Sequence, residues 1–388
     1  LLPFSYLRPV CDIRVGILTI RQKWEKYLGV KASFITAAYL SEKFPLVIED
    51  DNLLIDGSVL PSAQLLPLIE KLDTNEALLH NGEILAARLT AEQFAELMSG
   101  KRPEHLTGYE LKDTPIYQIN HYWEILKIHD EAFLSDFALL TNDQESEDIP
   151  AGNVVIAPKN IFIAENVKIQ GCSLNASTGP IYIGPGAEIM EGGFIRGAFA
   201  LLDNALVKMG SKIYGTTTIG PNSKVAGEIK GSILFGNSNK AHDGFLGDSV
   251  LAEWCNLGAG TNNSNLKNNY AEVKLWDFTK ERFVLSGSQF LGLFMGDHSK
   301  CAISTVFNTG TTVGICANIF GEGFPRNLIP SFAWGGKQGF STYSQEKAFE
   351  TIELVYARRG TKLEETERQI LSNVFEASAS QRFWEKRS

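Results

Sequence analysis

The chain has 388 residues, of which 44% are hydrophobic and 21% charged, and its formal net charge is −9. This length exceeds a single ordinary core, so we expect two domains. The acidic balance argues against nucleic acid as a partner, because neutralising phosphates requires a basic surface. A role in the membrane is also excluded, since no apolar run approaches the roughly 20 residues of a membrane-spanning helix.

The five cysteines are scattered along the chain and form no C-x-x-C pair: Cys11, Cys172, Cys255, Cys301 and Cys316. An odd, dispersed set is typical of reduced and mostly buried thiols, which predicts a cytoplasmic protein. The chain opens at Leu1 without a signal-peptide pattern and without an initiator methionine, so we expect a missing N-terminal piece.

Residues 1–148 mix strand-like and helical patterns. Short runs of β-branched and aromatic residues predict strands, and a 3.6-residue period predicts helices. The predicted elements are strands over 44–48 and 53–55 and helices over 91–98 and 129–140. This mixture indicates an α/β domain with a Rossmann-like sheet, and the polar linker 142–148 follows it.

From residue 183 onward, an aliphatic side chain recurs at every sixth position. The run is Ile183, Ile189, Ile195, Leu201, Val207, Ile213, Ile219 and Val225, and the step returns at Met295, Cys301, Phe307, Val313 and Ile319. Neither a helix nor an ordinary strand has a period of six, but a coil of three short strands does. Such coils must stack to bury the sixth side chains. The pattern predicts a left-handed parallel β-helix over residues 149–340, an exception to right-handed crossovers.

The remaining segments can be placed around this repeat. Residues 273–287, with polar side chains in the middle, predict a β-hairpin between the two runs. Residues 344–359 and 363–377 have helical patterns separated by Gly360. We expect residues 341–388 to form a helical cap, because the last coil would otherwise expose an open strand edge.

The stretch HDGFLGDSVLAEWCNLGAGTNNSN, residues 242–265, carries a more specific signal. It resembles the acetyltransferase signature of the bifunctional N-acetylglucosamine-1-phosphate uridylyltransferase/glucosamine-1-phosphate acetyltransferase family. That signature reads H-x-x-Y-[IL]-G-D, then N-I-G-A-G-T, then a C-N-Y turn. His242, the triplet 246–248, the run 256–261 and Asn265 match it in register. The resemblance covers roughly residues 150–320.

The resemblance implies that His242 is the general base that takes a proton from the sugar amine as the amine attacks the thioester of acetyl-CoA. An imidazole suits this task, since its ordinary pKa of about 6.5 lies near neutrality. Asn256 and Asn265 are implied to fix the amine and the ring hydroxyls. Gly258, Ala259 and Ile303 are implied as contacts of acetyl-CoA.

Lys230 keeps the family's spacing to the histidine and is implied to hold the sugar phosphate as a point charge. Phe245 stands where the family has a tyrosine, so a phenolic hydrogen bond to the phosphate is lost. The family's arginine two coils earlier has no clear counterpart, and Lys208, Lys212 or Lys224 could replace it.

The first residues, LLPFSYLRPVCDIRVGILTIRQKWE, resemble the stretch after the nucleotide loop of sugar-phosphate nucleotidyltransferases. The resemblance implies nucleotide or sugar-phosphate contacts at Arg8, Arg14 and Gly57. The family's lysine falls on Val10, and its metal-binding aspartate falls on Ser58, so Asp56 is the residue implied to bind Mg²⁺. The domain is either an active nucleotidyltransferase or a decayed, regulatory relative.

Three functions remain open from these residues. The leading one is an acetyl-CoA-dependent N-acetyltransferase for a glucosamine-1-phosphate-like sugar, joined to a nucleotidyltransferase-like domain that uses a nucleoside triphosphate, for cell-envelope precursors. The second is a nucleotidyltransferase for another sugar-1-phosphate, with the β-helix serving assembly. The third is a non-catalytic scaffold.

We also expect a homotrimer, because members of this fold class usually pack three prisms about one axis. The apolar residues predicted to lie at its interface are Trp254, Phe290, Leu291 and Phe294.

Overall fold

The computed structural model describes residues 1–101 and 105–385. By the density of contacts the chain divides into two compact units. The larger unit comprises Leu1–Leu7, Arg14–Ile17 and His121–Ser388, and the smaller one comprises Arg8–Ile13 and Leu18–Asn120. Within the described ranges, no helix has both the length and the apolar character needed to cross a membrane.

The smaller unit is an α/β structure built on a mixed sheet with the strand order β1-β3-β2-β4. Strands β1 and β2 run antiparallel to β3, and β4 runs parallel to β2, so the sheet differs from an all-parallel Rossmann sheet. Its elements are α1 (Ile20–Leu28), β1 (Asp51–Ile55), α2 (Leu66–Glu70), β2 (Glu76–His80), β3 (Glu83–Thr90), α3 (Ala91–Met98) and β4 (Thr107–Glu110), with the short 3₁₀ turns Val10–Asp12 and Ala38–Leu40.

Local sequence explains most of these boundaries. Thr90 and Gln93 form a capping box at the start of α3, which therefore begins where the pattern predicts. The predicted strand 53–55 lies within β1. The predicted strand 44–48 is wrong: this segment is irregular, because Pro45 cannot donate to a strand ladder and Val47 is 55% exposed.

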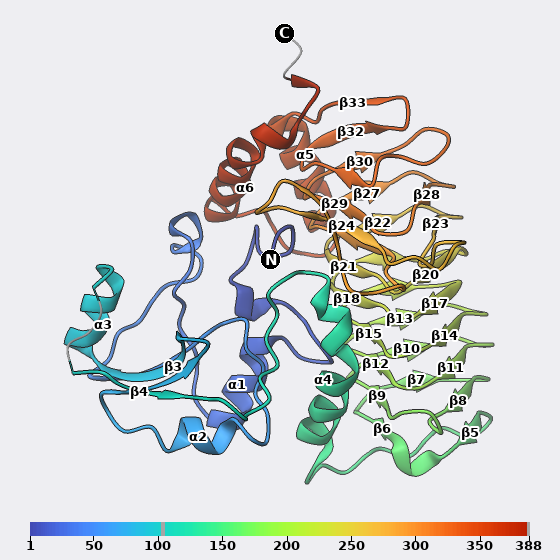
Figure 1. Ribbon diagram of the computed structural model, residues 1–388. Coiled ribbons are helices and arrows are strands. Elements are labelled where there is room, and N and C mark those ends of the chain that lie inside the picture. The colour runs from blue at the N-terminus through green and yellow to red at the C-terminus, as the bar shows by residue number, and fades with distance from the viewer. Residues whose placement is uncertain (102–104, 386–388) are drawn as a thin grey trace. The chain divides into compact units, whose positions relative to one another are not determined.

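The larger unit is a left-handed parallel β-helix, as the six-residue period predicts. Each of the first six coils contributes one strand to each of three faces (Figure 1). Face one contains β5 (Val154–Ile156), β8 (Ser173–Asn175), β11 (Phe194–Arg196), β14 (Lys212–Tyr214), β17 (Glu228–Lys230) and β20 (Phe245–Gly247). Face two contains β6 (Ile161–Ile163), β9 (Ile181–Ile183), β12 (Phe199–Leu201), β15 (Thr217–Ile219), β18 (Ile233–Gly236), β21 (Val250–Glu253), β26 (Leu293–Met295), β29 (Thr311–Val313) and β31 (Leu328–Ile329). Face three contains β7 (Lys168–Ile169), β10 (Glu188–Ile189), β13 (Leu206–Val207), β16 (Lys224–Val225), β19 (Asn239–Lys240), β22 (Asn256–Leu257), β27 (Lys300–Cys301), β30 (Asn318–Ile319), β32 (Ala333–Gly336) and β33 (Gly339–Thr342).

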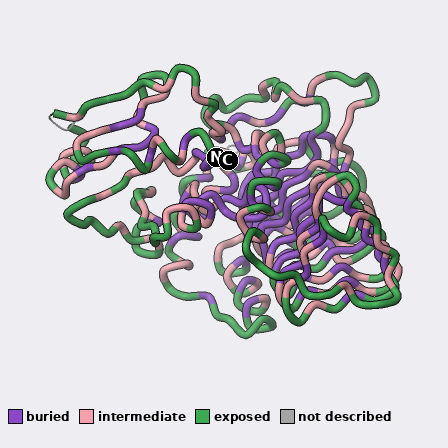
Figure 2. Tube along the Cα trace, turned by 90° about the horizontal axis from the view of Figure 1, so that it is seen from below, coloured by how far each residue is buried: buried purple, intermediate pink, exposed green. Residues whose placement is uncertain are grey.

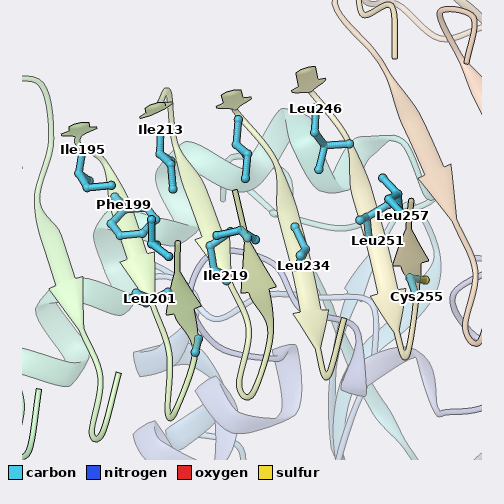
Figure 3. Packing of buried hydrophobic residues seen from close by; sticks show 14 of the residues in the cluster. Ile195, Phe199, Leu201, Ile213, Ile219, Leu234, Leu246, Leu251, Cys255 and Leu257 are labelled. Atoms are coloured by element: carbon cyan, nitrogen blue, oxygen red, sulfur yellow. The ribbon is translucent and has the colours of Figure 1, made fainter. Parts of the chain in front are cut away.

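The interior of the coils is filled by the side chains of the six-residue period. All eight members of the run from Ile183 to Val225 are at most 2% exposed. Figure 3 shows Ile195, Ile213 and Leu246 stacked on one wall and Leu201, Ile219, Leu234 and Leu251 on another. Buried residues accordingly fill the inside of the coil, and exposed ones follow its rim (Figure 2). Four of the five cysteines are buried and all are free thiols, as predicted.

The coils turn through backbone that asparagine tolerates. A residue with positive φ stands two positions before most strands of face three, and at several coils it is asparagine: Asn166, Asn204, Asn222 and Asn237. Asparagine enters this left-handed region more readily than other side chains do. His298 occupies the same corner position with φ of 59° and is buried, so it has a structural place.

Helix α4 (Glu124–Thr141) packs on face two. Phe133 lies against Ile17 and against Ala198, Ala200 and Leu202, which point outward from β12 and its flanks. The division by contacts therefore assigns α4 to the β-helix unit, whereas the predicted domain boundary falls after residue 148.

The hairpin and the two C-terminal helices form where the sequence predicts them. The hairpin consists of β24 (Lys274–Asp277) and β25 (Arg282–Leu285), and β23 (Asn262–Asn263) pairs with β28 (Val306–Phe307). The helical segments form α5 (Gln345–Ala357) and α6 (Glu365–Ala377), with Gly360 at φ of 70° between them. The last three residues of the expected cap lie outside the described residues.

Candidate functional site

His242 lies in the corner 241–244, which connects β19 of face three with β20 of face one. Its side chain is exposed and makes no hydrogen bond to any residue in the described ranges. The imidazole is therefore available to a ligand.

The backbone carbonyls of this corner are all engaged, in contrast to the imidazole. The carbonyl of Asp243 accepts from the amide of Gly260 at 3.0 Å, and that of Gly244 accepts from the amide of Glu228 at 3.2 Å. The two preceding carbonyls, of Ala241 and His242, accept from lysine ammonium groups. Because every carbonyl has a partner, the loop is held while its histidine side chain is free.

Lys230 lies on face one beside Asp248, which follows β20. Its Nζ is 3.3 Å from Oδ2 of Asp248, and the Nδ2 of Asn265 donates to the same oxygen at 2.5 Å. The ammonium also lies over the ring of Phe290, 4.7 Å from its centroid. The structure thus brings together two of the predicted substrate residues, Lys230 and Asn265, through a carboxylate that was assigned no role.

Strand β20 carries these groups on one short element. His242 precedes the strand and Asp248 follows it, and the three strand residues span roughly 10 Å. The free edge of β20 is closed by side chains that imitate a strand: Asn262 Oδ1 accepts from the amide of Phe245 at 2.8 Å, and Asn263 pairs with both backbone groups of Gly247. This explains why consecutive asparagines follow the glycine-rich turn.

A cavity of about 350 Å³ opens beside Lys230. Its lining includes Lys230, Asp248 and Phe290, together with Lys127 and Asp130 from α4. It contains charges of both signs, which suits a ligand that carries both an anionic and a cationic group. Neither His242 nor Asn256 lines this cavity.

The predicted acetyl-CoA contacts lie in the next coils. Ile303 is 73% exposed, so its side chain is available. Gly258 has a clear packing reason for being glycine: an added Cβ would lie 2.5 Å from backbone atoms of Ala302 and Ile303. Ala259 is half-buried, and Asn256 is exposed on the outward side of β22.

The predicted residues of the nucleotidyltransferase-like part do not form one group. Arg14 belongs to the β-helix unit, where its Nε donates to the carbonyl of Phe235 at 3.0 Å and its Nη1 to that of Ile17. Arg8, Asp56 and Gly57 belong to the smaller unit. A β-carbon on Gly57 would meet only ordinary contacts, so its packing does not require glycine.

Asp56 is engaged by its neighbours. Its Oδ1 accepts from the amide of Ser58 at 2.8 Å and from the hydroxyl of Ser58 at 2.7 Å, and Gln118 donates to Oδ2 at 3.2 Å. Throughout the described ranges, no group of three or more histidine, cysteine, aspartate or glutamate side chains is arranged to hold a metal ion. These contacts suit a turn-stabilising role for Asp56.

The predicted interface residues need one correction. Leu291 and Phe294 are buried inside the chain, at 2% and 0% exposure, and Trp254 packs on Tyr356 of α5 with 4.4 Å between ring centroids. Phe290 keeps 46% of its surface exposed. Trp254, Leu291 and Phe294 are covered by helices and loops of this chain that lie outside the six-residue repeat.

Comparison with known proteins gives three kinds of match: a family, similar proteins and a solved structure. Residues 1–145 match the family described as sugar nucleotidyl transferase. The chain is also similar to a bifunctional sugar-1-phosphate nucleotidylyltransferase/acetyltransferase of Sulfurisphaera tokodaii, with 30% identity over 170 residues, which are 43% of this chain and 40% of that protein. A bifunctional protein GlmU of Methanocaldococcus jannaschii is 34% identical over 87 residues, 22% of this chain and 21% of that protein.

The chain thus matches less than half the length of these relatives. Among solved structures, a UDP-N-acetylglucosamine acyltransferase from Bacteroides fragilis aligns with 58% of this chain and 96% of its own, at 12% identity and a TM-score of 0.26.

Proposed function

We propose that the β-helix transfers an acetyl group from acetyl-CoA to the amine of an amino-sugar phosphate of the glucosamine-1-phosphate type, with His242 as the general base. The observation that carries the proposal is the exposed and unengaged imidazole on a loop whose backbone carbonyls are all held. A base needs this combination, since it must meet a substrate proton at a fixed place. The name of the Sulfurisphaera tokodaii relative includes an acetyltransferase activity beside sugar-1-phosphate nucleotidyl transfer, which supports this proposal.

In the proposed reaction, the neutral amine attacks the thioester carbonyl and forms a carbon–nitrogen bond. His242 accepts the proton that the nitrogen loses, the carbon–sulfur bond breaks, and the coenzyme A thiolate leaves and is protonated. Lys230 holds the sugar phosphate, which displaces the ammonium from Asp248. This exchange costs little because a partly exposed ion pair is weak.

The remaining predicted contacts complete the site. Asn265 and Asn256 bind the amine and hydroxyl groups of the sugar, and Phe245 packs against the ring without a phenolic hydrogen bond. Gly258, Ala259 and Ile303 contact acetyl-CoA. We further propose that the protein acts in the cytoplasm in the synthesis of amino-sugar nucleotides for the cell envelope.

The test is the substitution His242→Ala, with acetyl-CoA consumption measured across amino-sugar-1-phosphates. We expect kcat to fall by about 10²–10⁴-fold. The circular dichroism spectrum should be unchanged, since the side chain is exposed and contributes little to the folded structure. A variant with turnover close to that of the wild type would exclude His242 as the base.

A second candidate keeps nucleotidyl transfer as the main activity, with the β-helix serving assembly. The match of residues 1–145 to sugar nucleotidyl transferases favours it. In this candidate, Arg8 and Gly57 of the smaller unit contact a nucleoside triphosphate or sugar phosphate, and Asp56 of the same unit binds Mg²⁺. If wild-type protein releases pyrophosphate with a sugar-1-phosphate but consumes no acetyl-CoA, this candidate replaces the first.

A further inference from the structure

Lys240 occupies an inward position of the β-helix, where the aligned residues are apolar. Parallel pairing aligns it with Val225 of the preceding coil, which in turn aligns with Val207. Its side chain is only 1% exposed. A buried ammonium is costly unless its protons are hydrogen-bonded, so its presence here requires a compensating role.

The protons of this ammonium reach two coil corners. The Nζ of Lys240 donates to the carbonyl of Ala226 at 3.2 Å and to the carbonyl of His242. Ala226 belongs to the corner of one coil and His242 to the corner of the next. The lysine therefore joins the two corners and ends on the backbone of the candidate base.

The lengths of the corners explain why a side chain is needed. The corner 226–227, between β16 and β17, has two residues, whereas the corners 208–211 and 241–244 on either side of it have four. A shorter corner offers fewer amide groups to the carbonyls of the loop stacked on it. Lys208 supplies a second side-chain donor in place of a missing amide. Its Nζ reaches past the short corner 226–227 and donates to the carbonyl of Ala241 at 3.3 Å.

We propose that Lys240, assisted by Lys208, is a positioning residue that fixes the His242 loop for proton transfer. The proposal rests on the assignment of His242 as the base. Charge-assisted hydrogen bonds to two consecutive carbonyls restrain the backbone on both sides of the His242 Cα. A displacement of about 1 Å in a catalytic group costs up to about 100-fold in rate, so losing this restraint should slow the reaction without weakening substrate binding.

The test is Lys240→Met, which keeps the length of the side chain and removes its charge and protons. We expect kcat for acetyl transfer to fall by about 10–100-fold, with KM for both substrates within about twofold. The melting temperature should change little, because removing the buried charge offsets the loss of the two hydrogen bonds to carbonyls. Lys208→Met should lower kcat in the same way but less, since Lys208 is only half-buried.

Combining variants separates positioning from general damage. If Lys240 acts through His242, Lys240→Met should have no further effect in the His242→Ala background. Lys168→Met is the matched control, because it removes the same charge from an exposed position on face three and should retain wild-type kcat.

The outcomes are distinct. Wild-type kcat in Lys240→Met, together with an inactive His242→Ala, overturns the positioning role and leaves the proposed function standing. An active His242→Ala overturns the proposed function itself. If Lys240→Met fails to fold, Lys208→Met decides, and a wild-type kcat in that variant overturns the proposal.

Discussion

His242 and Lys240 are two residues apart but are in opposite physical environments. The imidazole is exposed and unengaged, whereas the ammonium is buried in the coil and hydrogen-bonded to carbonyls. Burial lowers the pKa of Lys240 to about 8, and the nearby Asp243 and Cys301 oppose this shift. Lys240 therefore restrains the His242 loop, but its buried charge lowers the free energy of unfolding at neutral pH.

This cost predicts a pH dependence. An unfolded lysine has a pKa of about 10.4, so between about pH 8 and that value the unfolded state binds more protons at residue 240 than the folded state does. Raising the pH then favours the folded state. We expect wild type to gain on the order of a few kcal/mol relative to Lys240→Met as pH rises through this window.

Chemical denaturation of both proteins from pH 6.5 to pH 10 measures this difference. All other titrating groups are common to the two proteins, so their difference isolates Lys240. A constant difference across the range would show that the buried ammonium has an ordinary pKa.

At the scale of elements, the corners of the coil determine where function can reside. Many corners have four residues, and most of these four-residue corners contain a glycine or asparagine at positive φ. Gly258 is a glycine for a different reason, since its φ is not positive. Backbone atoms of Ala302 and Ile303 fill the space that a side chain at this position would occupy.

Gly258→Ala should therefore destabilise the coil. Its Cβ would approach backbone atoms to 2.5 Å, and backbone moves less readily than a side chain. We expect a loss of about 1–3 kcal/mol in the free energy of unfolding, measured by denaturant titration. Gly236→Ala is the control, since its Cβ would meet its nearest neighbours at 3.5 Å. Equal stability of the two variants would contradict this account.

At the scale of the whole molecule, the faces of the β-helix differ in how they are covered. Face two is packed against α4, whereas face one exposes apolar side chains, with Val154 at 63% and Phe194 at 60% exposure. These two side chains lie in one row of the face with Ser173 between them, and exposed apolar side chains of this size are suited to burial at a protein interface. Face one is therefore the surface that we expect to be buried between subunits.

We predict a homotrimer in solution, with closed cyclic symmetry. Light scattering should give a mass near three times 42.8 kDa, and Phe194→Glu should dissociate the assembly, because it would bury an unpaired charge. An acetyl-transferring monomer would contradict both the trimer and its coupling to activity.

The smaller unit leads to a separate prediction. Val10 provides no charge for a phosphate, and both oxygens of Asp56 are engaged by Ser58 and Gln118. We expect weak or absent release of pyrophosphate from a nucleoside triphosphate and a sugar-1-phosphate in the presence of Mg²⁺. Acetyl transfer measured on the same sample controls for protein quality, and robust pyrophosphate release would refute the prediction.

The sequence by itself determined the β-helix, its inward residues and the neighbourhood of His242. A period of six residues has one physical solution, and each of the eight residues from Ile183 to Val225 is buried as that solution requires. The hairpin and the C-terminal helices also follow from local signals, namely polar turns and helix ends.

Only the tertiary structure decided which groups meet. Asp248 joins Lys230 to Asn265 because adjacent coils pair here with an offset of 17 residues. Lys240 reaches the carbonyl of His242 where the corner of the preceding coil, 226–227, is two residues shorter than its neighbours. Leu291 and Phe294, predicted to be at an interface, are buried because other parts of the chain cover them. Periodicity fixes which way a side chain points, but the partner that it finds depends on the register of stacked coils and on elements outside the repeat.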